Sequence, residues 1–364
     1  MIKRVGDWYG RYERHISSIG LIAGFVFDAV KLKRVDLFWE NVWVLAHLLV
    51  AAAGLVVLNY YLNRPGRAGE EYRLYTFQFW LIFIIQFAFG GLLSTFLVFY
   101  FRSSTLAASW PFLLLLAGVF IGNEIFKKHY ARLSYQISVL FFSIFAFAIF
   151  IVPVIVHRIS DGVFILSGLV SLAAIGGFVW LLKYLTREKF YQSKKILMYS
   201  IAGVYLAVNL LYFFNLIPPI PLSLKEAGAY HSISKNVAGN YVATAEPASF
   251  WNWFRRYDPI HVVLGAPVYA YSAVFSPTAL NVDIVHVWQY YDESTRDWVT
   301  LSRINLPVVG GRDDGYRTYS MKRGLAPGRW RVNVETPRGQ VIGRIRFKVE
   351  PVKEFASWPV VLLE

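Results

Sequence analysis

The spacing of apolar residues changes along this chain and divides it into two parts. From about residue 16 to residue 217, Phe, Leu, Ile, Val and Ala form long runs that are separated by short polar loops. A helix needs about 20 largely apolar residues to cross a membrane. From residue 259 to residue 354, apolar and polar residues alternate with the period of two that is typical of a half-buried β-strand. We therefore predict a membrane all-α helical bundle followed by a small all-β, sandwich-like C-terminal domain.

Seven runs are predicted to span the membrane, within a polytopic membrane domain of residues 1–217. They lie near residues 16–34, 38–62, 75–101, 105–126, 134–157, 162–182 and 196–217. The first run is short, and a cleaved signal peptide is the alternative interpretation. No small-residue cleavage site follows it and the basic "KLKR" comes next, so we interpret it as an uncleaved first span.

Basic residues in the loops predict the orientation of these helices. Lys and Arg are concentrated in the loops 63–74, 127–133 and 183–195, and short loops rich in Lys and Arg remain in the cytoplasm. With seven spans, the N-terminus is cytoplasmic and the chain after residue 217 is extracytoplasmic. The exception is the basic "KLKR" stretch, which this topology leaves outside.

Composition supports the membrane assignment. Charged residues make up only 16% of the 364 residues, and the net charge is +14, whereas soluble domains contain about 25% charged residues. Before Pro221 there are 20 Lys and Arg against 10 Asp and Glu, as expected of cytoplasmic loops that face anionic lipid. We therefore assign the basic charge to topology and predict no nucleic-acid partner. The absence of cysteine excludes disulfides and thiolate catalysis.

Four ionisable residues lie within or at the ends of the predicted spans: Asp28, Glu40, His47 and Glu124. An ionisable group inside a membrane is a candidate functional residue. Only His47 lies deep in a span, and one buried histidine more often hydrogen-bonds to a neighbouring helix than relays protons. We expect structural roles here, with transport as the alternative.

Residues 218–258 are predicted to be a Pro-rich linker that ends in an aromatic and basic juxtamembrane segment. The closely spaced prolines after residue 217 cannot continue a helix. The segment is a candidate membrane-surface contact, with the aromatic rings in the headgroup region and the arginines near phosphate. The alternative is an ordinary buried segment of the outer domain. The candidate residues are Trp251, Trp253, Phe254, Arg255 and Arg256.

Residues 259–354 are predicted to form the extracytoplasmic β-sandwich. In "RWRVNVET" and "QVIGRIRFKVE", apolar residues alternate with Arg, Asn and Lys, and the intervening "TPRG" suits a type I turn. These segments predict an antiparallel hairpin with one buried face and one basic face. His286 and Trp288 share a strand face and, with Trp330, are expected to form an aromatic core.

The basic face of this hairpin is the strongest candidate binding site in the sequence. Like charges on adjacent strands destabilise a sheet by some tenths of a kcal/mol each, and an anionic partner would offset that cost. Anionic lipid, an acidic glycan or an acidic patch of an envelope protein subunit are the candidate partners. The alternative is a solubilising face with counter-charges such as Glu335 and Glu350. The candidate residues are Arg329, Arg331, Arg344, Arg346 and Lys348.

Motifs that carry chemistry are absent from the sequence. There is no HExxH, GxSxG or P-loop pattern, and the "DDG" at 313–315 is interpreted as a turn. Acids and histidines that could converge in space are scattered through the membrane-proximal segment, but sequence cannot pair them: Glu226, His231, Glu246, Asp258 and His261. We predict no catalytic residue, metal site or cofactor.

The segments "HVW" (286–288), "GYRTYSMK" (315–322) and "PGRWRVNVETPRGQVIGRIRF" (327–347) resemble the domain of unknown function 2914 family. The N-terminal "GFVFDAVKLKRVDLFWEN" is similar to the membrane half of larger members. The resemblance implies a bacterial envelope protein with an extracytoplasmic β-rich domain, and it supplies no activity, catalytic residue or cofactor.

Three functions fit these expectations. The first is a bacterial inner-membrane protein whose periplasmic β-domain binds an envelope component or a partner subunit. The second is a transporter or channel with the β-domain as an outer lid. The third is a membrane enzyme that acts on lipid-linked or glycan substrates. For the first, charge reversal by Arg329→Glu with Arg344→Glu is expected to lower association with anionic vesicles or a partner.

Overall fold

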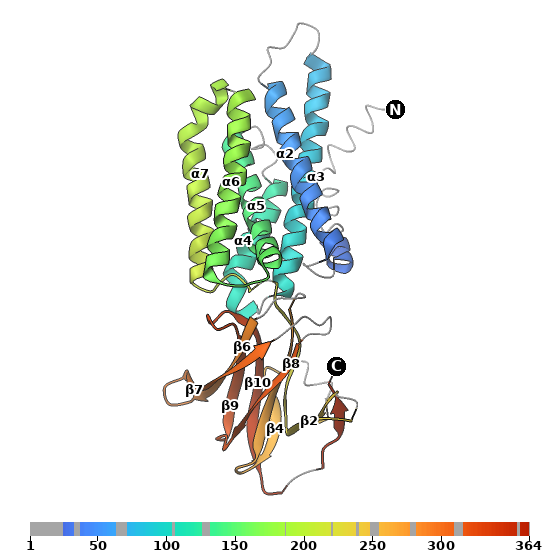
Figure 1. Ribbon diagram of the computed structural model, residues 1–364, viewed down its shortest axis with the longest axis vertical. Coiled ribbons are helices and arrows are strands. Elements are labelled where there is room, and N and C mark those ends of the chain that lie inside the picture. Colours follow the sequence, from blue (N-terminus) through green and yellow to red (C-terminus); the bar gives the residue numbers. More distant parts are fainter. Residues whose placement is uncertain are drawn as a thin grey trace. The chain divides into compact units, whose positions relative to one another are not determined.

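The computed structural model (Figure 1) divides into a helical unit, which contains most of the chain up to Leu216, and a β-rich unit, which contains Ile217 onward and the short segments Ser103–Ser109 and His157–Ile159. The residues that the structure describes are 25–32, 37–62, 71–103, 106–125, 132–185, 187–219, 221–237, 240–247, 255–276, 282–308, 316–354 and 357–363. Apolar helices followed by a β-rich region are the predicted fold class, and this order is confirmed.

A short helical stretch at 25–31 and six longer helices make up the described part of the helical unit. The longer helices are α2 (Phe38–Leu62), α3 (Glu71–Arg102), α4 (Leu106–Ile125), α5 (Leu133–Val156), α6 (Asp161–Leu185) and α7 (Arg187–Phe213). All except α4 contain a segment long and apolar enough to cross a membrane. These five helices correspond to five of the seven predicted spans.

The other two predicted spans are not among these five helices. The span predicted at 105–126 is helix α4, whose apolar part, Ser109–Asn123, is shorter than the rest and contains Pro111. Of the span predicted at 16–34, the described residues are helical only at 25–31, and residues 16–24 lie outside the described part of the chain. Among the described residues, the structure therefore supports five helices long and apolar enough to cross a membrane.

Helix α5 is the central element of the helical unit, because it packs against α2, α3, α6 and α7. Two buried hydrogen bonds join it to its neighbours. The Asn59 side-chain amide of α2 donates to Gln136 Oε1 at 2.7 Å, and the Tyr100 hydroxyl of α3 donates to the Ala146 carbonyl at 3.0 Å. These two contacts pair polar groups across neighbouring apolar helices.

The β-rich unit contains three sheets. Its strands are β1 (Ser223–Tyr230), β2 (Ser232–Lys235), β3 (Tyr241–Thr244), β4 (Asp258–Val263), β5 (Pro267–Phe275), β6 (Val282–Asp292), β7 (Asp297–Val308), β8 (Tyr316–Arg323), β9 (Gly328–Glu335), β10 (Val341–Val352) and β11 (Val360–Leu362). The strand orders are β1-β5-β8, β4-β10-β9-β6-β7 and β11-β3-β2. All pairs are antiparallel except β4 with β10.

The β1-β5-β8 sheet lies between the other two and is covered on both faces. One core, which includes Val268 and Ala270 of β5, contains Trp288, Trp330 and Phe347 of the five-stranded sheet. A second core packs other residues of β5 against β2, β3 and the residue after β11. Burial on both sides explains why β5, "PVYAYSAVF", shows almost no polar alternation.

The predicted aromatic core is confirmed, and His286 lies within it. His286, Trp288 and Trp330 are each at most 1% exposed. The His286 ring lies between two serine hydroxyls, with Nδ1 2.8 Å from Ser320 Oγ and Nε2 2.8 Å from Ser272 Oγ. A neutral imidazole satisfies both contacts, donating one hydrogen bond and accepting the other.

The predicted hairpin is formed by β9 and β10. The Gly339 N–H donates to the Thr336 carbonyl at 2.8 Å, as a β-turn at "TPRG" requires. At its other end β9 begins at Gly328, which has φ +129° and would bring an added Cβ within 3.2 Å of the Tyr290 ring. Glycine is therefore required there both for the backbone conformation and for the space.

The segment predicted to be a linker differs most from expectation. Strands β1, β2 and β3 of the β-rich unit lie within this segment, and β11 lies beyond the predicted end at residue 354. Strand β1, "SLKEAGAY", has few of the β-branched and aromatic residues that signal a strand. It is a strand because it pairs with β5, a contact that local sequence does not reveal.

Candidate functional site

The predicted basic residues lie on the side of the five-stranded sheet that faces away from the aromatic core. We call Arg329, Arg331, Arg344, Arg346 and Lys348 the arginine face. In the β9–β10 pair, Arg331 is opposite Arg346 and Arg329 is opposite Lys348, while Arg344 is opposite Asn333. Residues directly opposite have Cβ atoms about 5 Å apart. The alternation predicted for this hairpin therefore gathers five cationic side chains on one face.

The two residues at the edge of the arginine face have acidic partners. Arg329 forms a bidentate ion pair with Glu293, with Nη2 2.7 Å from Oε1 and 2.8 Å from Oε2. Lys348 Nζ donates to Glu350 Oε1 at 2.9 Å. These contacts neutralise two charges, as expected of a solubilising face.

The three central residues, Arg331, Arg344 and Arg346, are held differently, and we call them the arginine triad. Arg331 Nε donates to Gln289 Oε1 and Arg344 Nε donates to Asn333 Oδ1, both at 2.6 Å. Both acceptors are neutral amide oxygens, so no charge is cancelled. Within the described part of the chain, no acceptor is within hydrogen-bonding distance of the terminal nitrogens of Arg331 or Arg344, nor of the Arg346 guanidinium.

Electrostatics within the triad are unfavourable to the charged state. Burial, followed by the nearby charges of Arg344 and Arg346, lowers the pKa of Arg331 to about 10. Burial and the charge of Arg346 likewise lower the pKa of Arg344. A bound anion would oppose both effects, because an opposite charge favours the cationic form.

One buried carboxylate lies beside the triad. Glu335 is 7% exposed, accepts a hydrogen bond from Asn333 Nδ2 at 2.9 Å and is 3.7 Å from Arg303 Nη2. Burial raises the pKa of Glu335, against the influence of Asn333 and of the nearby arginines. Because Arg303 is also cationic, one carboxylate offsets only a part of the positive charge of this region.

Aromatic rings support the arginines. The Arg331 guanidinium lies 4.1 Å from the centre of the Trp298 ring, and that of Arg329 lies 3.9 Å from the Tyr291 ring. The Tyr257 ring stacks on Trp298, with ring centres 6.5 Å apart. Cation–π contacts favour the charged arginine and restrict its orientation. Strand alternation places Tyr291 of β6 and Trp298 of β7 on one side of the sheet. The two rings come close to the arginines only because these strands pair.

The second predicted site is continuous with the arginine face. The Arg256 guanidinium lies 5.9 Å from the ring of Tyr257, the residue that stacks on Trp298. Arg255 and Arg256 are both exposed. The other predicted residues of this segment, Trp251, Trp253 and Phe254, lie outside the described residues. The membrane-surface role of the segment therefore stays a prediction.

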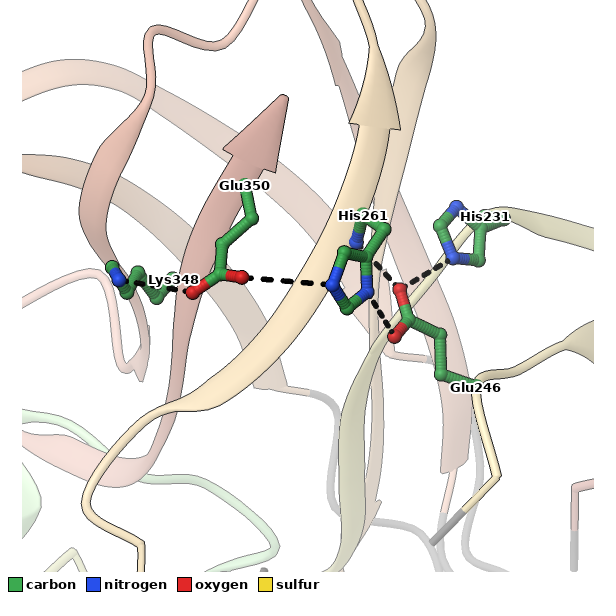
Figure 2. Close-up of polar contacts among 5 residues, drawn as sticks. All are labelled: His231, Glu246, His261, Lys348 and Glu350. Carbon is green, nitrogen blue, oxygen red and sulfur yellow. Dashed lines mark hydrogen bonds and ion pairs between the residues drawn. The ribbon is translucent and has the colours of Figure 1, made fainter. Parts of the chain in front are cut away.

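A carboxylate and two histidines converge elsewhere in the β-rich unit (Figure 2). Glu246 accepts from the His261 backbone N–H, lies 2.8 Å from His261 Nδ1 through Oε2 and lies 3.1 Å from His231 Nε2 through Oε1. On its other side His261 Nε2 is 3.5 Å from Glu350, which also binds Lys348. Sequence alone did not pair these residues.

This carboxylate–histidine cluster connects two of the sheets. Glu246 follows β3 of the small sheet, whereas His261 lies in β4 opposite Glu350 of β10 in the five-stranded sheet. Trp358, near the C-terminus, stacks on the His231 ring with ring centres 6.0 Å apart. The described residues contain no group of three acidic or histidine side chains placed to hold a metal ion. We interpret the cluster as a polar link that holds the sheets together.

Two of the ionisable residues predicted within the helices, Asp28 and His47, lie near each other. Asp28 is 8% exposed and lies within electrostatic range of Ser94 and His47. His47 Nδ1 is 2.9 Å from the Trp43 carbonyl one turn earlier, and its ring packs on Trp43. Glu40 is half-buried, and the side chain of Glu124 lies outside the described set. The structural role expected of these residues stays a prediction.

These features define a class of protein: a chain of apolar helices followed by a β-rich unit that carries an arginine-rich face. Residues 281–349 match the family model described as "Protein of unknown function (DUF2914)". The match includes the core histidine and tryptophans and the whole arginine face, and it confirms the family resemblance expected from the sequence.

Other comparisons add no function. No curated protein matches the chain significantly. Among solved structures, the alkylpurine DNA glycosylase AlkC of Pseudomonas fluorescens, bound to DNA containing an abasic site analog, aligns with 87% of this chain and 100% of its own. The identity is 10% and the TM-score is 0.22, so this likeness carries no inference about fold or activity.

Proposed function

We propose that this is a bacterial inner-membrane protein whose β-domain lies outside the cytoplasm and binds an anionic envelope component at the arginine face. In this proposal the apolar helices cross the membrane and the N-terminus is cytoplasmic. The role is binding rather than catalysis.

The observation that carries the proposal is the arginine triad. Three neighbouring guanidinium groups on one sheet face form no ion pair with any described residue, although Arg329 and Lys348 beside them each form one. A face selected only for solubility would not require three half-buried like charges in adjacent positions. An anionic ligand removes this repulsion and fills the hydrogen-bonding capacity of the terminal nitrogens.

Vesicle flotation tests the proposal. The full chain, reconstituted in nanodiscs of zwitterionic lipid, is expected to float with phosphatidylglycerol vesicles and not with phosphatidylcholine vesicles. Arg344→Glu with Arg346→Glu should abolish flotation, whereas Arg323→Glu, at an exposed position at the end of β8, should not. Arg329 is a poorer choice for charge reversal, because Glu293 already neutralises it.

Two results would contradict the proposal. The first is equal flotation of the double variant and the wild type. The second is equal loss in the Arg323→Glu control, because that loss would reflect overall charge rather than a site. Increasing salt should weaken flotation of the wild type, since surface electrostatic attraction is screened.

A further inference from the structure

We infer that Arg331, Arg344 and Arg346 form a binding site for a phosphate monoester group. The inference deepens the proposed function and rests on it, because it names the chemical group that the arginine face recognises. The site lies on β9 and β10, near the middle of the five-stranded sheet.

The first argument is the hydrogen-bonding geometry of the guanidinium groups. In Arg331 and Arg344 the Nε donor is occupied by an amide oxygen at 2.6 Å. Their terminal nitrogens have no acceptor within the described part of the chain and together form the edge that binds oxyanions in a fork-like, bidentate manner. Arg346 lies directly opposite Arg331 and contributes a third guanidinium.

The second argument is that the donors are oriented before any ligand binds. Gln289 Oε1 accepts from both Arg331 Nε and, at 3.3 Å, Asn333 Nδ2. Asn333 in turn holds Arg344 and is fixed by Glu335. The Trp298 ring restrains the plane of Arg331. Orientation in advance lowers the entropy lost on binding.

The third argument is charge and the number of oxygen atoms. A phosphate monoester carries a charge of about −1.5 to −2 near neutral pH and three terminal oxygens. A carboxylate or a phosphodiester carries one charge and two available oxygens. The nearby Glu335 is 3.7 Å from Arg303, so it offsets only a part of the charge of the three guanidinium groups. The triad therefore matches a phosphate monoester better than a carboxylate or a phosphodiester.

Isothermal titration of the full chain in neutral detergent tests the site directly, with inorganic phosphate as the probe. Binding should be saturable and about tenfold or more tighter than binding of acetate, because only phosphate can occupy three guanidinium groups. Arg344→Lys and Arg346→Lys keep the charge but lose the fork, so each should weaken phosphate binding by about tenfold. Arg323→Lys is the matched control and should bind like the wild type.

Arg346→Lys is the variant least expected to disturb folding, because the Arg346 side chain makes no hydrogen bond to a described residue, and its backbone pairing in the β9–β10 ladder does not depend on the side chain. The inference fails if both lysine variants bind phosphate like the wild type, or if acetate binds as tightly as phosphate. In either case flotation with anionic vesicles can persist, so the proposed function would survive. If the wild type showed neither preference for anionic vesicles nor phosphate binding, both the proposed function and the phosphate site would be contradicted.

A second arm identifies the source of the phosphate group. Vesicles that contain phosphatidic acid present a phosphate monoester, and phosphatidylglycerol vesicles of equal surface charge present a phosphodiester. Preference for phosphatidic acid supports the site and assigns it to a lipid. Equal vesicle binding with tight binding of glycerol phosphate also supports the site and assigns it to a soluble or glycan-borne group. Binding of neither monoester contradicts it.

Discussion

The two faces of the five-stranded sheet are made by alternate residues of the same strands, yet they satisfy their polar groups to very different degrees. On the core side, the ring nitrogens of Trp330 and His286 both have partners, and the apolar side chains are buried. On the opposite side, the arginine triad is half-buried and its terminal nitrogens have no acceptor among the described residues. Polar groups in a protein core are usually hydrogen-bonded within the protein. Guanidinium nitrogens that have no such acceptor are better explained by a ligand that supplies one.

The largest expected difference between the two faces is how much each contributes to folding stability. Trp330 and Arg331 are adjacent in sequence but lie on opposite faces, so replacing each in turn compares the faces. Trp330→Ala should lower the free energy of unfolding of the β-rich unit by about 3–5 kcal/mol, because it opens a cavity in the core. Arg331→Ala, one residue later, should change it by less than about 1 kcal/mol. Urea denaturation of both variants measures this. Equal losses would mean that the arginine face is also a folding element.

The core face should also make stability depend on pH. Burial lowers the pKa of His286 to about 4 from its ordinary value of 6.5. The unfolded chain therefore binds the proton first, so stability that is complete above pH 6.5 is lost as the pH falls towards 4. The loss should reach about 3 kcal/mol.

The His286→Gln variant isolates this dependence, since glutamine can pair with both serines but does not titrate. Urea denaturation should be measured at neutral pH and at a pH near the folded-state pKa of His286. The free energy of unfolding should fall less between these two pH values in the variant than in the wild type. Parallel pH profiles of the two proteins would contradict the assignment to His286.

Close packing between the core face and β1 predicts an effect of intermediate size. A Cβ added at Gly343 would lie 2.0 Å from Leu224 Cδ2 and 2.9 Å from its Cγ. Gly343→Ala should therefore destabilise the unit by about 1–3 kcal/mol through overpacking. Combining it with Leu224→Ala should cost less than the two single changes together. Strict additivity in thermal denaturation would show that the two residues are not in contact.

The smallest expected change in stability is at the arginine triad itself. Arg346→Gln removes one of the like charges, so the free energy of unfolding should stay the same or rise by a few tenths of a kcal/mol. Phosphate binding should weaken at the same time. A clear fall in the free energy of unfolding, measured by urea denaturation, would contradict the claim that Arg346 is repelled by its neighbours.

Much of this comparison could be predicted from local sequence. A period of two assigns Trp330 and Arg331 to opposite faces, and "TPRG" specifies the turn that pairs β9 with β10. The arginine face is thus visible in one hairpin. The residues that hold it are not, because Gln289 and Trp298 come from β6 and β7, and their pairing depends on long-range contacts.

Long-range pairing also explains what the sequence did not predict. The parallel pairing of β4 with β10 places His261 opposite Glu350, almost ninety residues later in the chain, and Glu246 reaches His261 only because β3 belongs to a separate small sheet. Local sequence predicts a linker at 218–258 for the same reason, since β1 pairs with β5 and β3 pairs with β11, both distant in the chain. Local patterns predict faces and turns, whereas tertiary contacts decide which faces meet.

The most direct test of the difference between the two faces is thermal unfolding of the full chain with and without inorganic phosphate. A ligand that binds only the folded state raises the unfolding temperature. We expect phosphate to stabilise the wild type and not the triple variant Arg331→Gln, Arg344→Gln, Arg346→Gln, whose unfolding temperature without phosphate should be no lower than that of the wild type. Equal stabilisation of both proteins by phosphate, or earlier unfolding of the ligand-free triple variant, would contradict the account.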